Sequence, residues 1–187
     1  MSSDYRRKDL HVSDKLMRRV ARYDAQAFEE LYNQSSGAVF GLAMSILGHR
    51  QDAEDVVQNT YISIYEKIQD YEGEGKAMAW IFTIARNHAY MILRDRQKRQ
   101  HVDLDDVHDI GVETTVAEDL HKEQLVELLL EHLNEDERQI VVMHAMSNMK
   151  HKDIAKTLDM PLSTVLSKYR RSLKKLQTVM EVNDYET

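Results

Sequence analysis

The sequence predicts an all-α protein of two small helical domains, which an acidic flexible linker joins and of which the second is a helix-turn-helix. Three observations carry this prediction. The 187 residues include one proline and six glycines, so the two residues that most disfavour helix interiors are scarce. Apolar residues recur every three or four positions along most of the chain, as they do on one side of a helix. An acidic segment without that periodicity divides the chain, as is typical of a linker.

Charge is segregated along the chain. Residues 103–137 hold thirteen acids and one lysine, a net charge of −12, and residues 149–178 hold eight bases and two acids, a net charge of +6. A second basic cluster lies just before the acidic segment, at residues 94–99. The formal net charge of −7 is therefore a sum of opposed surfaces and does not argue against a nucleic-acid partner.

Composition excludes several classes of protein. The chain has no cysteine, which excludes disulfide scaffolds, thiolate metal sites and cysteine nucleophiles. Its apolar runs are too short to span a membrane and residues 1–10 are too polar for a secretory signal, so we expect a cytoplasmic protein without membrane insertion. Glu118-x-x-His121 is half of a di-iron motif whose second half is missing. We therefore expect no metal and no cofactor.

The domain boundaries follow from where the periodicity stops and resumes. Residues 1–23 are expected to form an N-terminal extension and a first helix, and residues 24–100 the first domain. Residues 101–117 are the expected linker, and residues 118–187 the second domain.

The first domain begins with an N-cap at Asp24 and a helix over the residues that follow, and a second apolar run covers residues 39–47. We expect residues 35–37, Ser-Ser-Gly, to kink or end the first helix before that run. After a turn at residues 48–51, Asp52 is the expected N-cap of the next helix, which carries a single apolar stripe.

Two glycines in three residues predict a loop at residues 70–76. A long helix should follow over residues 77–99, with Trp80 and Met91 on its inward side.

The second domain carries the sharper motif. Residues 134–137, Asn-Glu-Asp-Glu, predict a capped helix start, and a short helix should cover residues 150–158. Residues 159–161, Asp-Met-Pro, end that helix because proline cannot continue it. Ser163 or Thr164 is expected to cap the next helix, which completes a helix-turn-helix.

The second helix of such a motif enters the major groove by its N-terminal end. That position puts four side chains near base edges and two arginines near phosphates: Ser163, Thr164, Ser167 and Lys168, then Arg170 and Arg171. The alternative is a helical hairpin with a solvated basic face.

Two segments of the first domain and one of the second resemble a known family. The first two, which resemble region two of bacterial sigma factors, read Asp52-Ala-Glu-Asp55-Val-Val-Gln58-Asn-Thr60-Tyr61 and Ala79-Trp80-Ile-Phe-Thr-Ile84-Ala-Arg86-Asn87. Residues 133–176 resemble region four. Together, over roughly residues 24–177, the chain resembles the extracytoplasmic-function (ECF) sigma factors.

This resemblance implies an alternative sigma factor for transcription initiation, which is not an enzyme, with a role in stress response. Such a factor binds core RNA polymerase and promoter DNA and is held by an anti-sigma factor. The helix-turn-helix would read the −35 element. The first domain would open and read the −10 element as single strand, with a pocket in the loop of residues 71–76 and cations along the backbone; its expected DNA contacts are Tyr71, Lys76, Asn87, Arg94, Arg96, Lys98 and Arg99.

The resemblance further implies that one polar helix face docks on the polymerase, through Asp52, Asp55, Gln58 and Asn59. These side chains could instead only solvate the helix, and Tyr71 could instead pack on Trp80. Two other functions stay open: a stand-alone helix-turn-helix regulator, which would bind duplex DNA without polymerase, and an all-helical interaction protein. The turn differs from the family, which usually has a glycine where this chain has Asp159-Met160-Pro161.

Overall fold

The computed structural model describes residues 12–100 and 131–184, and every regular element within these ranges is a helix. The all-α prediction is confirmed. Within the described residues no helix is long and apolar enough to cross a membrane. The predicted linker and the predicted Glu118–His121 pair lie outside the described residues.

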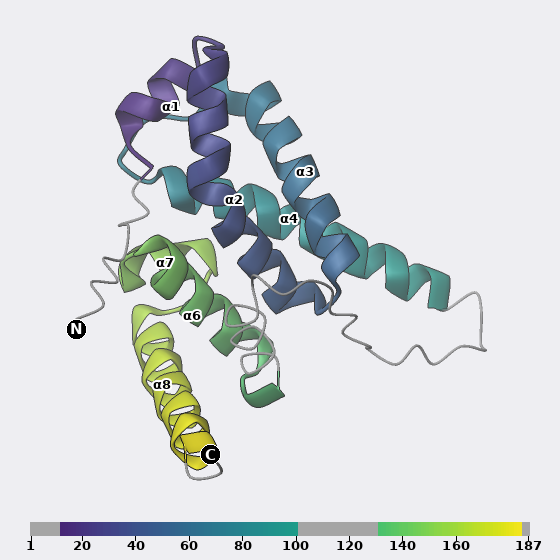
Figure 1. Ribbon diagram of the computed structural model, residues 1–187, viewed down its shortest axis with the longest axis vertical. Coiled ribbons are helices and arrows are strands. Elements are labelled where there is room, and N and C mark those ends of the chain that lie inside the picture. The colour runs from purple at the N-terminus through teal and green to yellow at the C-terminus, as the bar shows by residue number, and fades with distance from the viewer. Residues whose placement is uncertain (1–11, 101–130, 185–187) are drawn as a thin grey trace.

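The first group of helices surrounds a long central helix, α2 (Figure 1). Helices α1, α3 and α4 all contact it. The elements of this group are α1 (Asp14–Val20), α2 (Ala25–Leu47), α3 (Arg50–Lys67), the 3₁₀ turn η1 (Ile68–Asp70) and α4 (Ala77–Gln100).

Asp24 caps α2 as predicted, since its carboxylate accepts the N–H of Ala27 at 3.0 Å. The helix does not end at residues 35–37, because α2 is continuous to Leu47. The reason is tertiary: buried Ser35 bonds the Leu31 carbonyl and the Tyr61 hydroxyl, each at 2.6 Å. Its hydroxyl is therefore fully bonded inside the core, through the backbone carbonyl four residues earlier and through a second helix, and α2 continues past it.

The start of α3 also differs from the prediction. The helix begins at Arg50, and His49 rather than Asp52 is its N-cap. The His49 ring accepts the N–H of Asp52 at 3.4 Å. Asp52 lies in the first turn, where a carboxylate favours the helix N-terminus.

The second group is the predicted helix-turn-helix with one helix before it. The group consists of α6 (Glu135–Ser147), α7 (His151–Thr157) and α8 (Leu162–Asp184). The predicted capping box is present, with both bonds between Asn134 and Glu137. Asp159 has a φ of 52°, which is the left-handed conformation that glycine usually supplies in a turn. Because α8 begins at Leu162, Ser163 and Thr164 lie in its first turn and are not its caps.

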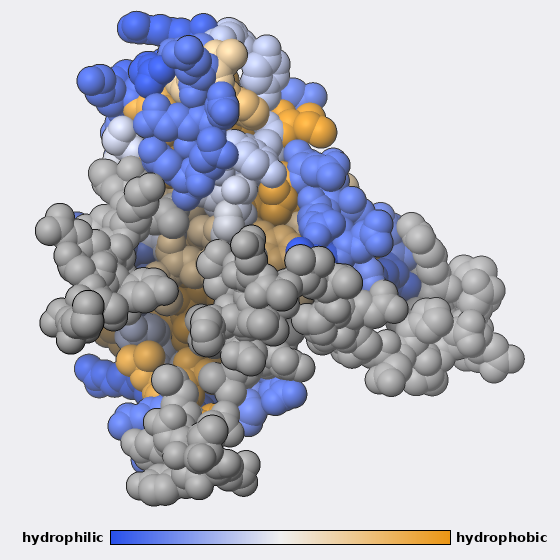
Figure 2. Space-filling view, viewed as in Figure 1, coloured by the Kyte–Doolittle hydropathy of each residue, from blue (hydrophilic) through white to orange (hydrophobic). Residues whose placement is uncertain are grey.

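The two groups pack against each other through α2 and α6. Gly41 of α2 is buried at this contact, where an added Cβ would lie 2.6 Å from the Met146 sulfur and 3.6 Å from Val142. Hydrophobic residues gather in the middle of the view in Figure 2, where the groups meet, whereas the surrounding surface is mainly hydrophilic. The missing side chain of Gly41 lets the two helices approach closely.

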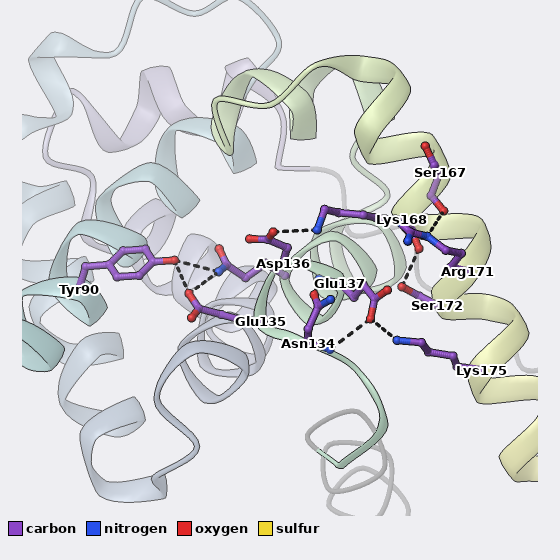
Figure 3. Close-up of polar contacts among 11 residues, drawn as sticks. Tyr90, Asn134, Glu135, Asp136, Glu137, Ser167, Lys168, Arg171, Ser172 and Lys175 are labelled. Carbon is purple, nitrogen blue, oxygen red and sulfur yellow. Dashed lines mark hydrogen bonds and ion pairs between the residues drawn. The ribbon is translucent and has the colours of Figure 1, made fainter.

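Polar bonds from α4 surround this contact. Arg86 donates to the Gln139 side chain at 2.9 Å and to the Thr157 carbonyl at 2.7 Å, so one guanidinium binds both α6 and α7. The Tyr90 hydroxyl donates to Glu135 at 2.5 Å and accepts from Gln139 at 3.0 Å (Figure 3). These bonds set the angle at which the second group sits on the first.

We predict that Gly41→Leu drives α6 away from α2, because the larger side chain would overlap Met146 and Val142. Overpacking of this kind costs about 1–3 kcal/mol. Small-angle X-ray scattering should show a larger radius of gyration, with unchanged helix content by circular dichroism.

Gly37→Leu is the matched control, since an added Cβ at this position of the same helix meets nothing within 4 Å. Its scattering curve should equal that of the wild type. An unchanged radius of gyration for Gly41→Leu would contradict the contact.

Candidate nucleic-acid interface

The outward side of α8 carries most of the residues predicted to contact the −35 element. Ser163, Ser167, Arg170 and Arg171 are exposed and Thr164 is half-buried. Positions 163, 167, 170 and 171 share one side of the helix, because residues three and four apart lie above one another. The Ser167 hydroxyl bonds the Ser163 carbonyl and Arg171 donates to the Ser167 carbonyl at 3.4 Å. The structure therefore brings these predicted residues together at the N-terminal half of the second helix.

Lys168 lies differently from the rest of this set. Its ammonium is 2.9 Å from the Asp136 carboxylate of α6, and its side chain is only 18% exposed. A second pair, Lys175 with Glu137 at 2.7 Å, joins the same two helices (Figure 3). Burial raises the pKa of Glu137, but the bonds from Lys175 and the Asn134 N–H outweigh it and hold that pKa below its ordinary value. These two ion pairs hold α8 against α6.

Three rings that the sequence did not single out hold the helix-turn-helix together. His144 and His151 stack with ring centroids 4.5 Å apart, and Tyr169 stands edge-on to both, at 4.9 and 4.7 Å. The His144 Nδ1 atom lies 2.9 Å from the Met149 carbonyl. The His151 Nε2 atom is buried with no hydrogen-bond partner. Burial, followed by the nearby His144, lowers the pKa of His151. His151 is the first residue of the short helix α7, and its position could be read from the sequence. Its ring partners on α6 and α8 could not, because tertiary packing brings them together.

Three of the predicted −10 residues form a stripe along α4, and the loop lies at its head. Asn87, Arg94 and Lys98 are exposed, and from Trp80 onward these positions are seven, seven and four residues apart, which places them on one side of the helix. Met91 belongs to this stripe and is 55% exposed, so its expected inward position is wrong. The side chain of Arg99 lies outside the described residues.

In the loop, the Tyr71 ring packs on Trp80 with centroids 5.5 Å apart, which is the alternative left open from sequence. Lys76 pairs with Glu74. This pairing, chiefly its hydrogen bond, raises the pKa of Lys76, and the more distant Asp153 of α7 acts in the same direction. The second helix group therefore lies within electrostatic reach of the loop.

A separate face of α3 carries the residues expected to dock on a polymerase. Asp55, Gln58 and Asn59 are exposed, whereas Asp52 is half-buried and paired with Arg96. Asp52 and Arg96, predicted for two different partners, thus bind each other.

Two apolar residues that sequence reasoning missed lie on this same face: Ile62 is 57% exposed and Tyr65 is 51% exposed. The sequence does contain a signal for this exposure, because both residues are apolar but lie off the apolar stripe of α3. They line a groove of about 470 Å³ that also includes Gln58, Tyr23 and Phe28. Exposed apolar side chains grouped in this way are typical of a protein-binding surface.

Within residues 12–100 and 131–184, no group of three or more histidine, aspartate or glutamate side chains is arranged to hold a metal ion.

The chain matches two protein-family models in order. Residues 31–99 match "Sigma-70 region 2", and residues 123–176 match "Sigma-70, region 4". Among curated proteins, the ECF RNA polymerase sigma factor SigK of Mycobacterium tuberculosis is 26% identical over 178 residues, which are 91% of this chain and 94% of the relative. The ECF RNA polymerase sigma-E factor of Haemophilus influenzae is 28% identical over 178 residues, 89% of this chain and 94% of the relative.

Two solved structures share the fold. The sigma factor RpoE of Bartonella quintana, in complex with the anti-sigma factor NepR, has a TM-score of 0.68 at 24% identity and covers 83% of this chain and 97% of its own. CnrH, in complex with the cytosolic domain of CnrY, has a TM-score of 0.64 at 20% identity and covers 91% of this chain and 97% of its own.

We predict that acid weakens the helix-turn-helix through His151. The pKa of this histidine lies below its ordinary 6.5, so below about pH 6.5 the unfolded chain binds a proton that the folded chain does not. Stability should therefore fall as the pH drops through this window. His151→Phe keeps the ring contacts and removes the proton. Its unfolding midpoint should fall less between pH 7 and 5.5 than that of the wild type.

His132→Phe, at an exposed position, is the control and should keep the wild-type pH dependence. Equal pH dependence in His151→Phe and the wild type would contradict the role of His151.

Proposed function

We propose that this chain, which belongs to the ECF group of the sigma-70 family, is an alternative sigma factor that binds core RNA polymerase and directs it to specific promoters. The observation that carries the proposal is the presence, in one chain and in family order, of region 2 and region 4. A transcription initiation factor of this kind supplies recognition, and we propose that the chain is no enzyme and works in the bacterial cytoplasm.

For the −35 element, we propose recognition by the outward side of α8. Ser163 and Ser167 are short side chains near the N-terminal end of the helix, which is the end that reaches base edges in this motif. Arg170 and Arg171 follow on the same exposed side, where phosphate contacts set the register. Lys168 joins them only by leaving Asp136.

For the −10 element, we propose that the loop of residues 71–76 and the stripe on α4 bind single-stranded DNA. Arg94 and Lys98 are exposed cations that can follow a backbone. Exposed Met91 lies between Asn87 and Arg94 on the stripe and offers an apolar surface for an unstacked base.

For the polymerase, we propose docking on the outward face of α3. Its polar residues Asp55, Gln58 and Asn59 continue into the apolar pair Ile62 and Tyr65. An apolar centre with a polar rim is the usual anatomy of a protein interface.

The proposed function requires the two helix groups to separate. The −35 and −10 elements lie roughly 25 base pairs apart, which is about 85 Å of duplex. In the packed arrangement α6 lies on α2, and Arg86 of α4 binds the Thr157 carbonyl of α7 at 2.7 Å, so the two helix groups are too close together to span that length. We propose that α6 leaves α2 when the polymerase complex binds a promoter.

An anti-sigma factor is a further proposed partner. The two solved structures named above each contain a second protein: RpoE of Bartonella quintana is in complex with the anti-sigma factor NepR, and CnrH is in complex with the cytosolic domain of CnrY. The alternative of a stand-alone regulator is not favoured, since such a protein would not need region 2.

We predict core-dependent run-off transcription from a genomic promoter pool, and none from the chain or the core enzyme alone. Specific duplex binding by the chain alone, with no transcription on adding core enzyme, would favour the stand-alone regulator instead.

Asp55→Ala should weaken binding to core polymerase about fivefold, as expected for an exposed charge contact of about 1 kcal/mol. Fluorescence anisotropy of a labelled chain titrated with core enzyme measures the change. Glu29→Ala, an exposed acid on α2, is the matched control and should bind as the wild type does. Equal affinities for all three would contradict docking through Asp55.

Arg170→Ala should weaken promoter binding by the holoenzyme about equally for all −35 sequences, because a phosphate contact carries no base information. The slope of log affinity against log salt should fall by about 1. A change in −35 sequence preference instead would assign Arg170 to base readout.

A further inference from the structure

Asp14, the first residue of α1, is bonded to the loop between α3 and α4. Its Oδ1 atom accepts the Tyr71 hydroxyl at 2.6 Å. The Gly75 N–H donates to Oδ2 at 3.0 Å and to Oδ1 at 3.2 Å. One carboxylate thus binds two donors of a loop that begins 57 residues further along the chain.

The loop has little else to fix its backbone in the middle. Gly73 and Gly75 have φ values of 76° and 69°, in the region that favours glycine. An added Cβ at either position would meet nothing within 4 Å, so neighbouring side chains do not hold the backbone there. Lys76 pairs with Glu74, whose side chain is exposed. Without Asp14, we expect several loop conformations of similar energy.

The Tyr71 side chain connects Asp14 to the side of α4 that is proposed to bind the −10 element. Its hydroxyl binds Asp14 while its ring packs on Trp80, at the head of the stripe that contains Asn87. Burial, and then the bond to Asp14, raise the pKa of Tyr71, so the phenol stays protonated and remains a donor. Asp14 is thereby joined to both ends of the loop, through Tyr71 at its start and Gly75 near its end.

We propose that Asp14 is a positioning residue for the −10 element: it holds the loop of residues 71–76 in one conformation for single-stranded DNA. This role rests on the proposed function of the loop. A preformed loop loses less conformational entropy on binding and discriminates between bases more sharply. Helix α1, to which the family resemblance gives no role, is then part of the promoter-reading machinery.

The first experiment tests the restraint without DNA or polymerase. Amide hydrogen exchange by NMR at Gly75 should be about tenfold faster in Asp14→Ala than in the wild type. Lys15→Ala, which changes the next and exposed residue of α1, should leave the exchange unchanged. Equal exchange rates at Gly75 in Asp14→Ala and the wild type would overturn the proposal.

The second experiment tests promoter reading by the complete holoenzyme. Core polymerase with each variant transcribes a pool of linear templates that is randomised at both promoter elements, and the templates that yield transcripts are sequenced. In Asp14→Ala, enrichment of the preferred −10 bases should fall several-fold while the −35 motif keeps its enrichment. Asp14→Asn retains an acceptor and should lose less, and Tyr71→Phe should lose part of the same preference.

The −35 motif is the internal control. A merely structural Asp14 would lower transcript yield and leave the −10 preference intact, or lower both motifs together, and either result would overturn the proposal. If the wild type gives no core-dependent transcripts, the proposed function fails and the reading role of Asp14 fails with it, whereas exchange at Gly75 still reports whether Asp14 restrains the loop.

Discussion

The contact between α2 and α6 determines how every other surface of the described chain is placed. Gly41 permits it by leaving room for Met146 and Val142. Arg86 completes it, because its two bonds reach α6 and the end of α7 together. A guanidinium suits this task since its donors are fixed in one plane and can bind two acceptors at once. The helix-turn-helix is thus oriented by a side chain from the other half of the protein.

This arrangement has consequences for an ECF sigma factor. Arg86 is the neighbour of Asn87, which is proposed to meet promoter DNA, so the same part of α4 serves the packed state and the DNA-bound state. Lys168 repeats this pattern on α8, where its ammonium is held by Asp136. Charges that DNA would attract are partly neutralised by the protein itself, which weakens binding to DNA by the free chain. Binding to polymerase and promoter together can offset the free energy lost when these bonds break, whereas binding to either one alone offsets less of it.

Much of the fold could be predicted because helices are specified locally. The caps at Asp24 and Asn134 and the turn before Pro161 depend on residues within a few positions of each other, and the structure contains all three. The uninterrupted course of α2 could not be predicted, because the bond that accommodates Ser35 comes from Tyr61 on another helix.

The candidate site was predictable only as a set of exposed residues on helix faces. Its bonds were not: Asp14 is far from Tyr71 in sequence, and the stacking of His144 on His151 depends on the turn between two helices. Such contacts arise from tertiary packing, which a single sequence does not encode in any short pattern.

The central claim, that one packed chain opens to read two promoter elements, is tested most directly by a distance. The chain has no cysteine, so cysteines introduced at exposed Asn33 of α2 and exposed Lys152 of α7 would carry the two spin labels of a double electron–electron resonance measurement. The account predicts one short distance in the free chain and a distance longer by tens of ångströms, on the scale of the roughly 85 Å between the elements, in the complex with core polymerase and promoter. The same short distance in an actively initiating complex would contradict it.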